Sequence, residues 1–544
     1  MAQHQRDEGP LAVPLEVLPP AGTEVVEVAG RLVQGSAQLF VERRARIDRL
    51  VIGGRGQRQE DNRQQGCGKR MGSHTASPFL VGRPGLGRFD ARPKRIFTPA
   101  WLAGLAVAAL LAAATGAPAA GRLLVTVGEV TPTTAVVWAR AAGEGEVTVE
   151  WGRAGSTPAS RTVRVERDAD FTTKVTLTGL TPRTGYAYRV RSRGETVSGE
   201  LVTAPGTNEP GPVTFLWSGD LGGGGFCRRV DRGYPIFRAM ARRPADFFLF
   251  VGDTIYADRR CGVRENVPGA DFIATRLEEF RAKHRYNRED AAVQDFFRRT
   301  PVYVIWDDHE VRNDFAGSTD PLMPVGRRAF LEYWPLAPPA EEPARLYRKF
   351  RWGRLLEVFI LDTRQYRSPN GDPDGPGKTM LGAAQRRWLI EGVSASTAVW
   401  KVIVSSVTLS VPTGRTHRDS WSNASVFGLP QEGTGFATER DLILRRFRER
   451  GLRNLVFVTA DVHHAELIRH HPAPEFSFHE FIAGPLSATQ GGPRPLDAAL
   501  NPRSLFARGG VNNFGEITVT AAHLTVTLID EAGDVLFTHT IGPE

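Results

Sequence analysis

The fold is decided by four short apolar stretches that end in acidic or imidazole side chains: VTFLWSGD (residues 213–220), DFFLFVGDTIYAD (246–258), VYVIWDDHE (302–310) and LRNLVFVTADVHH (452–464). Amphipathic stretches such as YPIFRAMARR (234–243) lie between them. Apolar strands that alternate with helices are typical of an α/β fold. Sheets of this kind place their active sites at the carboxyl ends of the strands.

The ends of these strands carry the candidate metal ligands Asp220, Asp253, Asp308, Asp461 and His463. A single Asp after a strand is usually a helix cap or a turn residue. Four such ends together indicate a shared site, because carboxylates held close to one another repel unless cations neutralise them. Asp and His ligands suit Fe, Mn, Mg, Ca or Zn better than copper–thiolate chemistry.

A small all-β sandwich is predicted over residues 122–205, before this α/β region. Seven short stretches, among them AVVWARA and YAYRVRS, alternate in hydrophobicity and are separated by Gly, Pro, Thr and Asp, which is typical of a β-sandwich. The stretch LTGLTPRTGYAYRVR (177–191) resembles part of a fibronectin type III domain, in which Leu180 and Tyr186 would be buried. The linker GTNEPGP (206–212) follows, and residues 212–544 form the predicted catalytic domain.

The N-terminal 121 residues are predicted to lie outside the working enzyme. Residues 1–95 are poor in core-forming side chains and are interpreted as a disordered or spurious extension. Residues 96–121 contain the apolar run IFTPAWLAGLAVAALLAAATGAPAA, which follows basic residues and ends in a small-residue cleavage pattern. It is either a cleaved signal peptide or a retained membrane anchor, and both indicate an exported protein, with membrane contact only if the segment is retained.

The formal charge of +9 is compatible with an anionic substrate but predicts no specific nucleic-acid partner, because Arg-rich blocks near the N-terminus supply part of it. The chain has three cysteines, Cys67, Cys227 and Cys261, and none forms a CxxC pair. Zinc-finger and thioredoxin-like functions therefore have no support. Nothing in the sequence indicates an oligomeric state.

The motifs GDTIY, WDDHE and ADVH, in this order, resemble the metallophosphoesterase series that includes the purple acid phosphatases. WDDHEVRNDF, LDTRQYR and ADVHH together are similar to the alkaline phosphatase D (PhoD-like) family. The resemblance covers roughly residues 122–544. It implies a four-layer α/β/β/α metallophosphoesterase domain, preceded by the sandwich, that hydrolyses phosphate monoesters and possibly diesters by means of a metal-bound hydroxide.

The resemblance also implies a set of metal ligands. Asp253 would bridge two metals, and Tyr256 would bind the first metal as a phenolate, with Asp220 and His463 completing that site. Asp308 would bind the second metal, with Asp461 beside it. Relatives use Fe(III) and Ca2+, and other divalent metals remain possible. His417 is the nearest candidate for a further ligand of the second metal.

Four other residues have roles that the sequence leaves open. His309 would protonate the leaving oxygen or hold the phosphate. Arg364 offers a fork to phosphate oxygens, or it forms a structural pair with Asp362 or Glu357, and Arg228 is a further candidate for phosphate binding. Cys227 is either a metal ligand, because PhoD-like enzymes can use a thiolate at the position that is assigned here to Asp220, or the disulfide partner of Cys261.

Two other functions remain as alternatives. A phospholipase or phosphodiesterase acting on lipid or cell-wall phosphodiesters would use the same ligands and differ in how open its pocket is. A non-catalytic, metal-stabilised binding module would need neither His309 nor Arg364.

Overall fold

The computed structural model describes residues 122–262, 264–414, 418–425 and 435–544. The predicted extension (1–95), the predicted leader (96–121) and His417 lie outside the described residues. Within the described part of the chain, no helix is long and apolar enough to cross a membrane.

Seven strands occupy the region in which the sequence predicts seven: β1 (Leu124–Gly128), β2 (Ala135–Arg140), β3 (Gly145–Gly152), β4 (Ala159–Val165), β5 (Thr172–Leu177), β6 (Gly185–Ser192) and β7 (Glu195–Val202). Four of them form an antiparallel sheet in the order β4-β3-β6-β7. A one-turn helix, η1 (Arg167–Ala169), precedes β5. Leu180 and Tyr186 are buried, as the sequence predicts.

The other three N-terminal strands belong to a different sheet. β1 pairs in parallel with β10 (Val302–Ile305) through Gly128 and Val302, and β2 and β5 extend the sheet beyond β1. A Cβ atom at position 128 would lie 2.3 Å from the carbonyl oxygen of Val302. Glycine is therefore needed for this close approach of two backbones.

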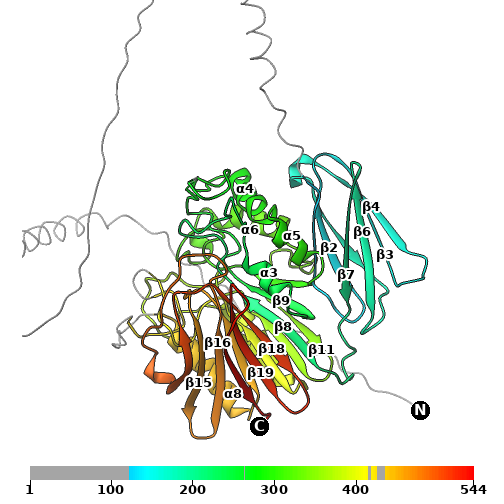
Figure 1. Cartoon of the computed structure of the whole chain (residues 1–544). Helices are drawn as coiled ribbons and strands as arrows, with labels where there is room; N and C mark the ends of the chain where they lie inside the picture. The colour runs from blue at the N-terminus through cyan, green and yellow to red at the C-terminus, as the bar shows by residue number, and fades with distance from the viewer. Residues whose placement is uncertain (1–121, 263, 415–417, 426–434) are drawn as a thin grey trace, which may run out of the picture. The chain divides into compact units, whose positions relative to one another are not determined.

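The resulting nine-stranded sheet has the order β20-β19-β18-β8-β9-β10-β1-β2-β5. Its remaining members are β8 (Val213–Ser218), β9 (Phe247–Val251), β18 (Asn513–Val519), β19 (Leu524–Asp530) and β20 (Val535–Ile541). β8, β9 and β10 are parallel, whereas the three C-terminal strands add in antiparallel fashion (Figure 1). Three of the four sequence stretches that predict the site are thus neighbouring parallel strands.

A seven-stranded sheet has the order β11-β12-β13-β14-β16-β15-β17. Its strands are β11 (Arg348–Trp352), β12 (Leu356–Ile360), β13 (Trp400–Val404), β14 (Leu455–Thr459), β15 (Ala465–Ala473), β16 (Phe476–Ile482) and β17 (Pro502–Arg508). β12, β13, β14 and β16 are parallel. The fourth stretch of the site, which ends in Asp461 and His463, follows β14.

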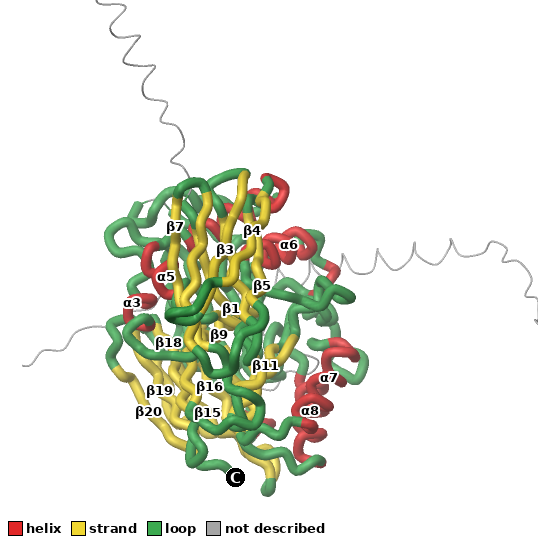
Figure 2. Tube along the Cα trace, turned by 90° about the vertical axis from the view of Figure 1, so that its right-hand side faces the viewer, coloured by secondary structure: helices red, strands yellow, loops and turns green. Residues whose placement is uncertain are grey.

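Among the described residues, the helices are α3 (Ile236–Met240), α4 (Leu277–Arg288), α5 (Ala291–Phe297), α6 (Met323–Tyr333), α7 (Gly382–Ala395) and α8 (Ala437–Glu449), with short 3₁₀ turns η2 (Gly317–Thr319) and η3 (Ala498–Leu500). Asp290 caps α5, because its side chain accepts hydrogen bonds from the amides of Ala292 and Val293. α7 and α8 lie beside the seven-stranded sheet (Figure 2). Leu389 of α7 and Ile443 of α8 belong to one apolar cluster with residues of that sheet.

The two large sheets share one apolar core. Trp217 of β8 contacts Phe481 of β16, with ring centroids 6.4 Å apart, and Phe247 of β9 lies 4.8 Å from Trp352 of β11. On its other face, β9 packs against α5, where the rings of Phe248 and Phe296 are 5.6 Å apart. This packing brings the carboxyl ends of parallel strands from both sheets to one place.

Candidate metal centre

The backbone immediately after the parallel strands is sharply turned. Asp220, Asp253, Asp461 and His463 have positive φ angles of 65°, 51°, 68° and 60°, a region that residues other than glycine rarely occupy. Such strain persists only where surrounding contacts hold it, and it is common at functional sites. Here each turn directs a potential ligand toward the same point.

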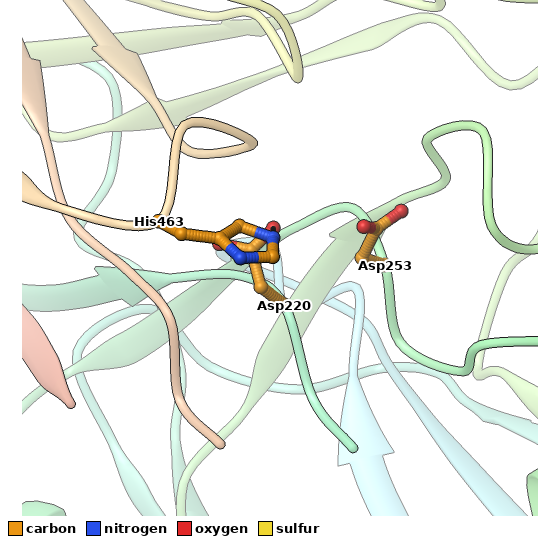
Figure 3. Close-up of side chains that lie close together, drawn as sticks. All are labelled: Asp220, Asp253 and His463. Carbon is orange, nitrogen blue, oxygen red and sulfur yellow. Dashed lines mark ion pairs between the residues drawn. The ribbon is translucent and has the colours of Figure 1, made fainter. Parts of the chain in front are cut away.

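The first group of potential ligands contains Asp220, Asp253 and His463, whose donor atoms lie within 4.8 Å of one another (Figure 3). The Tyr256 hydroxyl is 3.0 Å from Nε2 of His463. The structure therefore brings together all four side chains predicted for the first metal. Asp220 is 1% exposed, and any side chain at Gly484 would collide with it, because a Cβ there would lie 2.3 Å from Asp220 Oδ2.

A second group contains Asp253, Asp308 and His309. Asp253 belongs to both groups, so its two carboxylate oxygens are placed where a bridging ligand would be. Asp461 lines the same cavity as Asp253 and Asp308. The amide of Asp314 donates a 2.6 Å hydrogen bond to Asp308 Oδ2, which fixes the orientation of that carboxylate.

The chemistry of these donors fits bound cations. Both side-chain oxygens of Asp220, Oδ1 of Asp308 and Oδ2 of Asp461 are buried without a hydrogen-bond partner among the described residues. Burial, followed by repulsion from Asp307, raises the pKa of Asp220 and of Asp461 well above the usual range for a carboxyl. Buried, unpaired carboxylates are costly, and metal ions would supply the missing positive charge.

His463 is prepared to act as a neutral ligand. Its Nδ1 contacts the carbonyl oxygen of Thr489, an arrangement that would leave Nε2 with a free electron pair. Burial lowers the pKa of the imidazole to about 4. The Tyr256 phenol shows the opposite effect, because burial and then Asp253 raise its pKa, so it would ionise only beside a cation.

His309 is held by a carboxylate that the sequence prediction omits. Its Nδ1 lies 2.6 Å from Asp258 Oδ1, and its ring stacks on that of Tyr256 with centroids 4.1 Å apart. Burial opposes protonation of His309, but Asp308 and Asp258 outweigh it and raise the pKa to about 9. Asp258 comes two residues after Tyr256 in the same motif, and this proximity was the only signal available in the sequence.

The cavity over these residues, which we call the site cavity, has a volume of about 940 Å³. Its lining includes five carboxylates (Asp253, Asp258, Asp308, Asp314 and Asp461), two imidazoles (His309 and His463) and two arginines (Arg259 and Arg494). The other described lining residues are Tyr256, Gly, Thr, Asn and Gln, so no aliphatic side chain is among them. The sequence did not single out Arg259 or Arg494, because nothing local distinguishes them from the many other arginines of the chain.

Two family models match the chain. The model described as PhoD-like phosphatase matches residues 224–528, which is more than half of the chain, and the model of the PhoD-like phosphatase N-terminal domain matches residues 109–205. The chain belongs to the PhoD-like phosphatase family. The longer match includes all the predicted ligands except Asp220, which precedes it.

Individual relatives agree with this family. The chain is 29% identical over 322 residues to alkaline phosphatase D of Bacillus subtilis (strain 168), a match that covers 52% of each protein, so the chain spans about half the length of this relative. It shares the fold of a solved structure of PhoD (TM-score 0.63, 21% identity, 78% of this chain and 90% of that one). The purple acid phosphatase PPD1 of yellow lupin is also similar (TM-score 0.54, 13% identity, 77% and 74%).

Arg364 of this PhoD-like protein does not have the role that the sequence predicts. Its guanidinium is fully buried and does not line the site cavity. It forms two 2.7 Å bonds to the carboxylate of Asp419 and one of 2.6 Å to Asp307. The prediction that Arg364 binds substrate phosphate is therefore corrected, because its fork is already filled by carboxylates of the protein.

These ion pairs lie next to Asp308, one of the predicted metal ligands. The Asp308 carboxylate lies 3.9 Å from Nη2 of Arg364. Arg367 and Asn370 also bond Asp419. Burial alone would raise the pKa of Asp419, but the charges of Arg364 and Arg367 outweigh it and hold this pKa well below the usual range for a carboxyl. The alternative pairing of Arg364 with Asp362 or Glu357 is also not observed for the guanidinium, because only the backbone amide of Arg364 bonds Asp362.

Arg228 is also directed away from the site cavity. Its Nη1 donates a 2.8 Å hydrogen bond to the carbonyl oxygen of Tyr286, and its guanidinium lies 5.1 Å from the centre of the Tyr286 ring. The sequence places Arg228 near the end of the first strand, but the chain turns through four consecutive glycines, residues 222–225, before reaching it. The prediction that Arg228 binds phosphate is therefore corrected as well.

Cys227 and Cys261 form a disulfide. This resolves the alternative left open by the sequence, because a disulfide sulfur is not available as a thiolate ligand. The bond joins the loop that carries Gly223, which packs against the Tyr256 ring, to the loop that carries Asp258. It thus fixes two segments that form the wall of the site cavity.

Proposed function

We propose that the chain is a metal-dependent phosphatase that hydrolyses phosphate monoesters, with phosphate diesters as a second class of candidate substrate. The single observation that carries the proposal is the pair of ligand groups that share Asp253 beneath an open, polar cavity. Two metal ions bound there would supply an activated water as nucleophile and neutralise charge on the phosphoryl oxygens. The membership of the chain in the PhoD-like phosphatase family supports the same reaction.

The side chains of the site would have two kinds of role, metal binding and proton transfer. Asp220, Asp253, Tyr256 and His463 would hold the first metal, and Asp253, Asp308 and Asp461 the second. His309 would give a proton to the leaving oxygen from Nε2, while Asp258 holds Nδ1 and keeps the ring in place. Nε2 of His309 is 4.0 Å from Asp308 Oδ1, so the imidazole could instead bind the second metal together with Asp308. Metal analysis of the His309→Gln variant separates the two roles, since loss of an acid leaves the metal content intact.

The proposed metals are Fe(III) in the first site and Ca2+ in the second, with other divalent ions as alternatives. The donors are carboxylate, phenolate and imidazole, and the disulfide removes the nearby thiolates. Oxygen-rich sites favour hard cations. Metal analysis together with a visible absorption band from an iron–phenolate pair, lost in Tyr256→Phe, would test this assignment.

The polar lining of the site cavity favours a hydrophilic leaving group over a lipid. A phospholipase would be expected to present apolar side chains to acyl chains, and none of the described lining residues is aliphatic. We therefore place a phosphodiesterase acting on polar or cell-wall phosphodiesters ahead of the phospholipase, and a non-catalytic binding module last.

We further propose that the protein is exported, with residues 96–121 as its signal peptide or anchor. The Cys227–Cys261 disulfide supports this, because such bonds persist mainly outside reducing compartments. We also propose that residues 122–205 form a β-sandwich and residues 212–544 a four-layer α/β/β/α domain. The packing of α7 and α8 on one sheet and of α5 on the other supports the layers.

The proposed activity can be tested by comparing hydrolysis of 4-nitrophenyl phosphate and bis(4-nitrophenyl) phosphate at alkaline pH, with iron and calcium supplied. Asp253→Asn should abolish both activities. Asp534→Asn, which changes an exposed carboxylate in the turn between β19 and β20, is the matched control. Absence of hydrolysis in protein shown to contain its metals would refute the proposal and leave the binding module as the best alternative.

A further inference from the structure

Two arginines line the site cavity in addition to the metal ligands, and they come from different sheets. Arg259 lies on the loop after β9 of the nine-stranded sheet, and Arg494 lies on the loop after β16 of the seven-stranded sheet. Among the described lining residues they are the only side chains that carry a permanent positive charge. Neither is part of the buried ion pairs around Arg364.

Arg259 lies on the side of the site cavity that holds His309. Its Nε is 3.8 Å from Asp258 Oδ2, and the other oxygen of Asp258 holds His309. Its Nη2 donates a 3.2 Å hydrogen bond to Asn313 Oδ1. The side chain is 50% exposed, so most of its five donors face the cavity or solvent rather than the protein.

Arg494 lies on the side that holds His463. Its Nη1 donates a 3.0 Å hydrogen bond to the carbonyl oxygen of Pro412. The same loop contains Thr489, whose carbonyl contacts His463, and Gly491, whose amide donates a hydrogen bond to the carbonyl oxygen of His463. The two arginines are therefore associated with different ends of the metal centre, one with the proposed acid and one with a ligand of the first metal.

The volume of the site cavity exceeds what the scissile phosphate alone requires. At about 940 Å³ it lies near the upper end of the range of roughly 300–1,000 Å³ typical of ligand pockets. The scissile phosphoryl group would be held by the metals, which leaves the arginines for another part of the substrate. Arginine is well suited to bind a second phosphate or carboxylate through paired donors.

We propose that Arg259 is a specificity-determining residue that binds an anionic group on the leaving part of the substrate. This inference rests on the proposed phosphatase function. The leaving oxygen departs toward His309, and Arg259 lies on that side, so an anion a few bonds beyond the leaving oxygen would reach its guanidinium. The enzyme thus prefers phosphate esters whose alcohol carries a second negative charge.

The matched substrates for a test are 1,3-propanediol monophosphate and 1,3-propanediol bisphosphate. In both, water adds to phosphorus, the phosphorus–oxygen bond to the alcohol breaks, and the alcohol oxygen takes up a proton. The bisphosphate yields the monophosphate and inorganic phosphate, and its symmetry makes the two scissile bonds identical. The measured quantity is the ratio of kcat/KM for the bisphosphate to that for the monophosphate, halved to correct for the two equivalent bonds.

The expected result is a corrected ratio of about 5 in the native enzyme, because the free energy contributed by a half-exposed charge pair corresponds to at most about a fivefold change in kcat/KM. The ratio should fall toward 1 in Arg259→Gln, recover in part in Arg259→Lys, and decline with added salt in the native enzyme because salt screens exposed charges. Arg260→Gln is the matched control: Arg260 is adjacent and exposed, bonds the carbonyl of Asp271, and does not line the site cavity.

An unchanged ratio in Arg259→Gln would overturn the inference while leaving the phosphatase function intact. A ratio that falls in Arg494→Gln but not in Arg259→Gln would also overturn it, because the anion would then lie on the His463 side. If neither substrate is hydrolysed by metal-loaded enzyme that also fails with the nitrophenyl esters, the proposed function fails and the inference falls with it.

Discussion

Replacing Arg364 with methionine removes the cation at the centre of the buried ion pairs behind the proposed second metal site. Three short bonds to Asp307 and Asp419 are lost. Hydrogen bonds to charged groups contribute about 1.5–3 kcal/mol each but are not additive, and removing one partner of a buried pair costs about 3–5 kcal/mol. Because Arg367 still bonds Asp419, we expect the free energy of unfolding to fall by about 4 kcal/mol.

The assay is urea unfolding in the presence of a chelator, so that metal binding does not contribute to the difference. Arg364→Lys keeps the charge but cannot reproduce the fork, so it should lose part of the same stability. Arg386→Met is the matched control, because Arg386 forms a single 2.8 Å pair with Glu439 and is 26% exposed. A loss in Arg364→Met no larger than that of the control would refute our interpretation of Arg364 as the support of Asp308.

Three further predictions concern stability. Burial, and then Arg288, lowers the pKa of His284 to about 3, so below pH 6.5 this histidine is protonated in the unfolded chain but stays neutral in the folded protein. The free energy of unfolding should therefore decrease as the pH falls toward 3, by about 2 kcal/mol at pH 5. His284→Phe should reduce this loss, as measured by urea midpoints at pH 7.5 and 5. The guanidinium of Arg288 lies 4.1 Å from the ring centre of Trp138 and 4.6 Å from that of Trp334. Arg288→Met should be more stable to urea than Arg288→Ala by about 2 kcal/mol, because methionine fills the space that alanine would leave between the rings. Equal stability of the two variants would contradict this. The Cys227→Ser/Cys261→Ser variant should lose about 4 kcal/mol, the value expected for a separation of 34 residues, and should retain less metal after dialysis; full retention would show that the loops hold their positions without the disulfide.

The convergence of the proposed metal ligands could be predicted from the sequence because each follows an apolar strand. Asp220, Asp253, Asp308 and His463 occupy the first turns after β8, β9, β10 and β14, and parallel strands necessarily bring such turns to one edge. Each of these residues can therefore be recognised from its own strand, and the α/β fold class alone predicts that the four positions lie close together.

The roles of the surrounding charged residues could not be predicted in this way. Arg364 and Asp419 are 55 residues apart, and the direction of the Arg364 side chain depends on contacts that no local pattern records. The same holds for Arg259 and Arg494, which meet one cavity only after two sheets pack together. The pairing of β1 with β10 was also missed, because alternation predicts a strand but not its neighbour.

The pairing of β1 with β10 has a consequence for any attempt to separate the two parts of the chain. Without residues 122–205, β10 would be the terminal strand of its sheet, and the carbonyl oxygen of Val302, which accepts a hydrogen bond from the amide of Glu129, would lose this partner. Uncovered strands of this kind template intermolecular association. The N-terminal segment therefore covers the edge of β10 at Val302, and we expect a truncated protein beginning at Gly211 to aggregate more readily than the full chain.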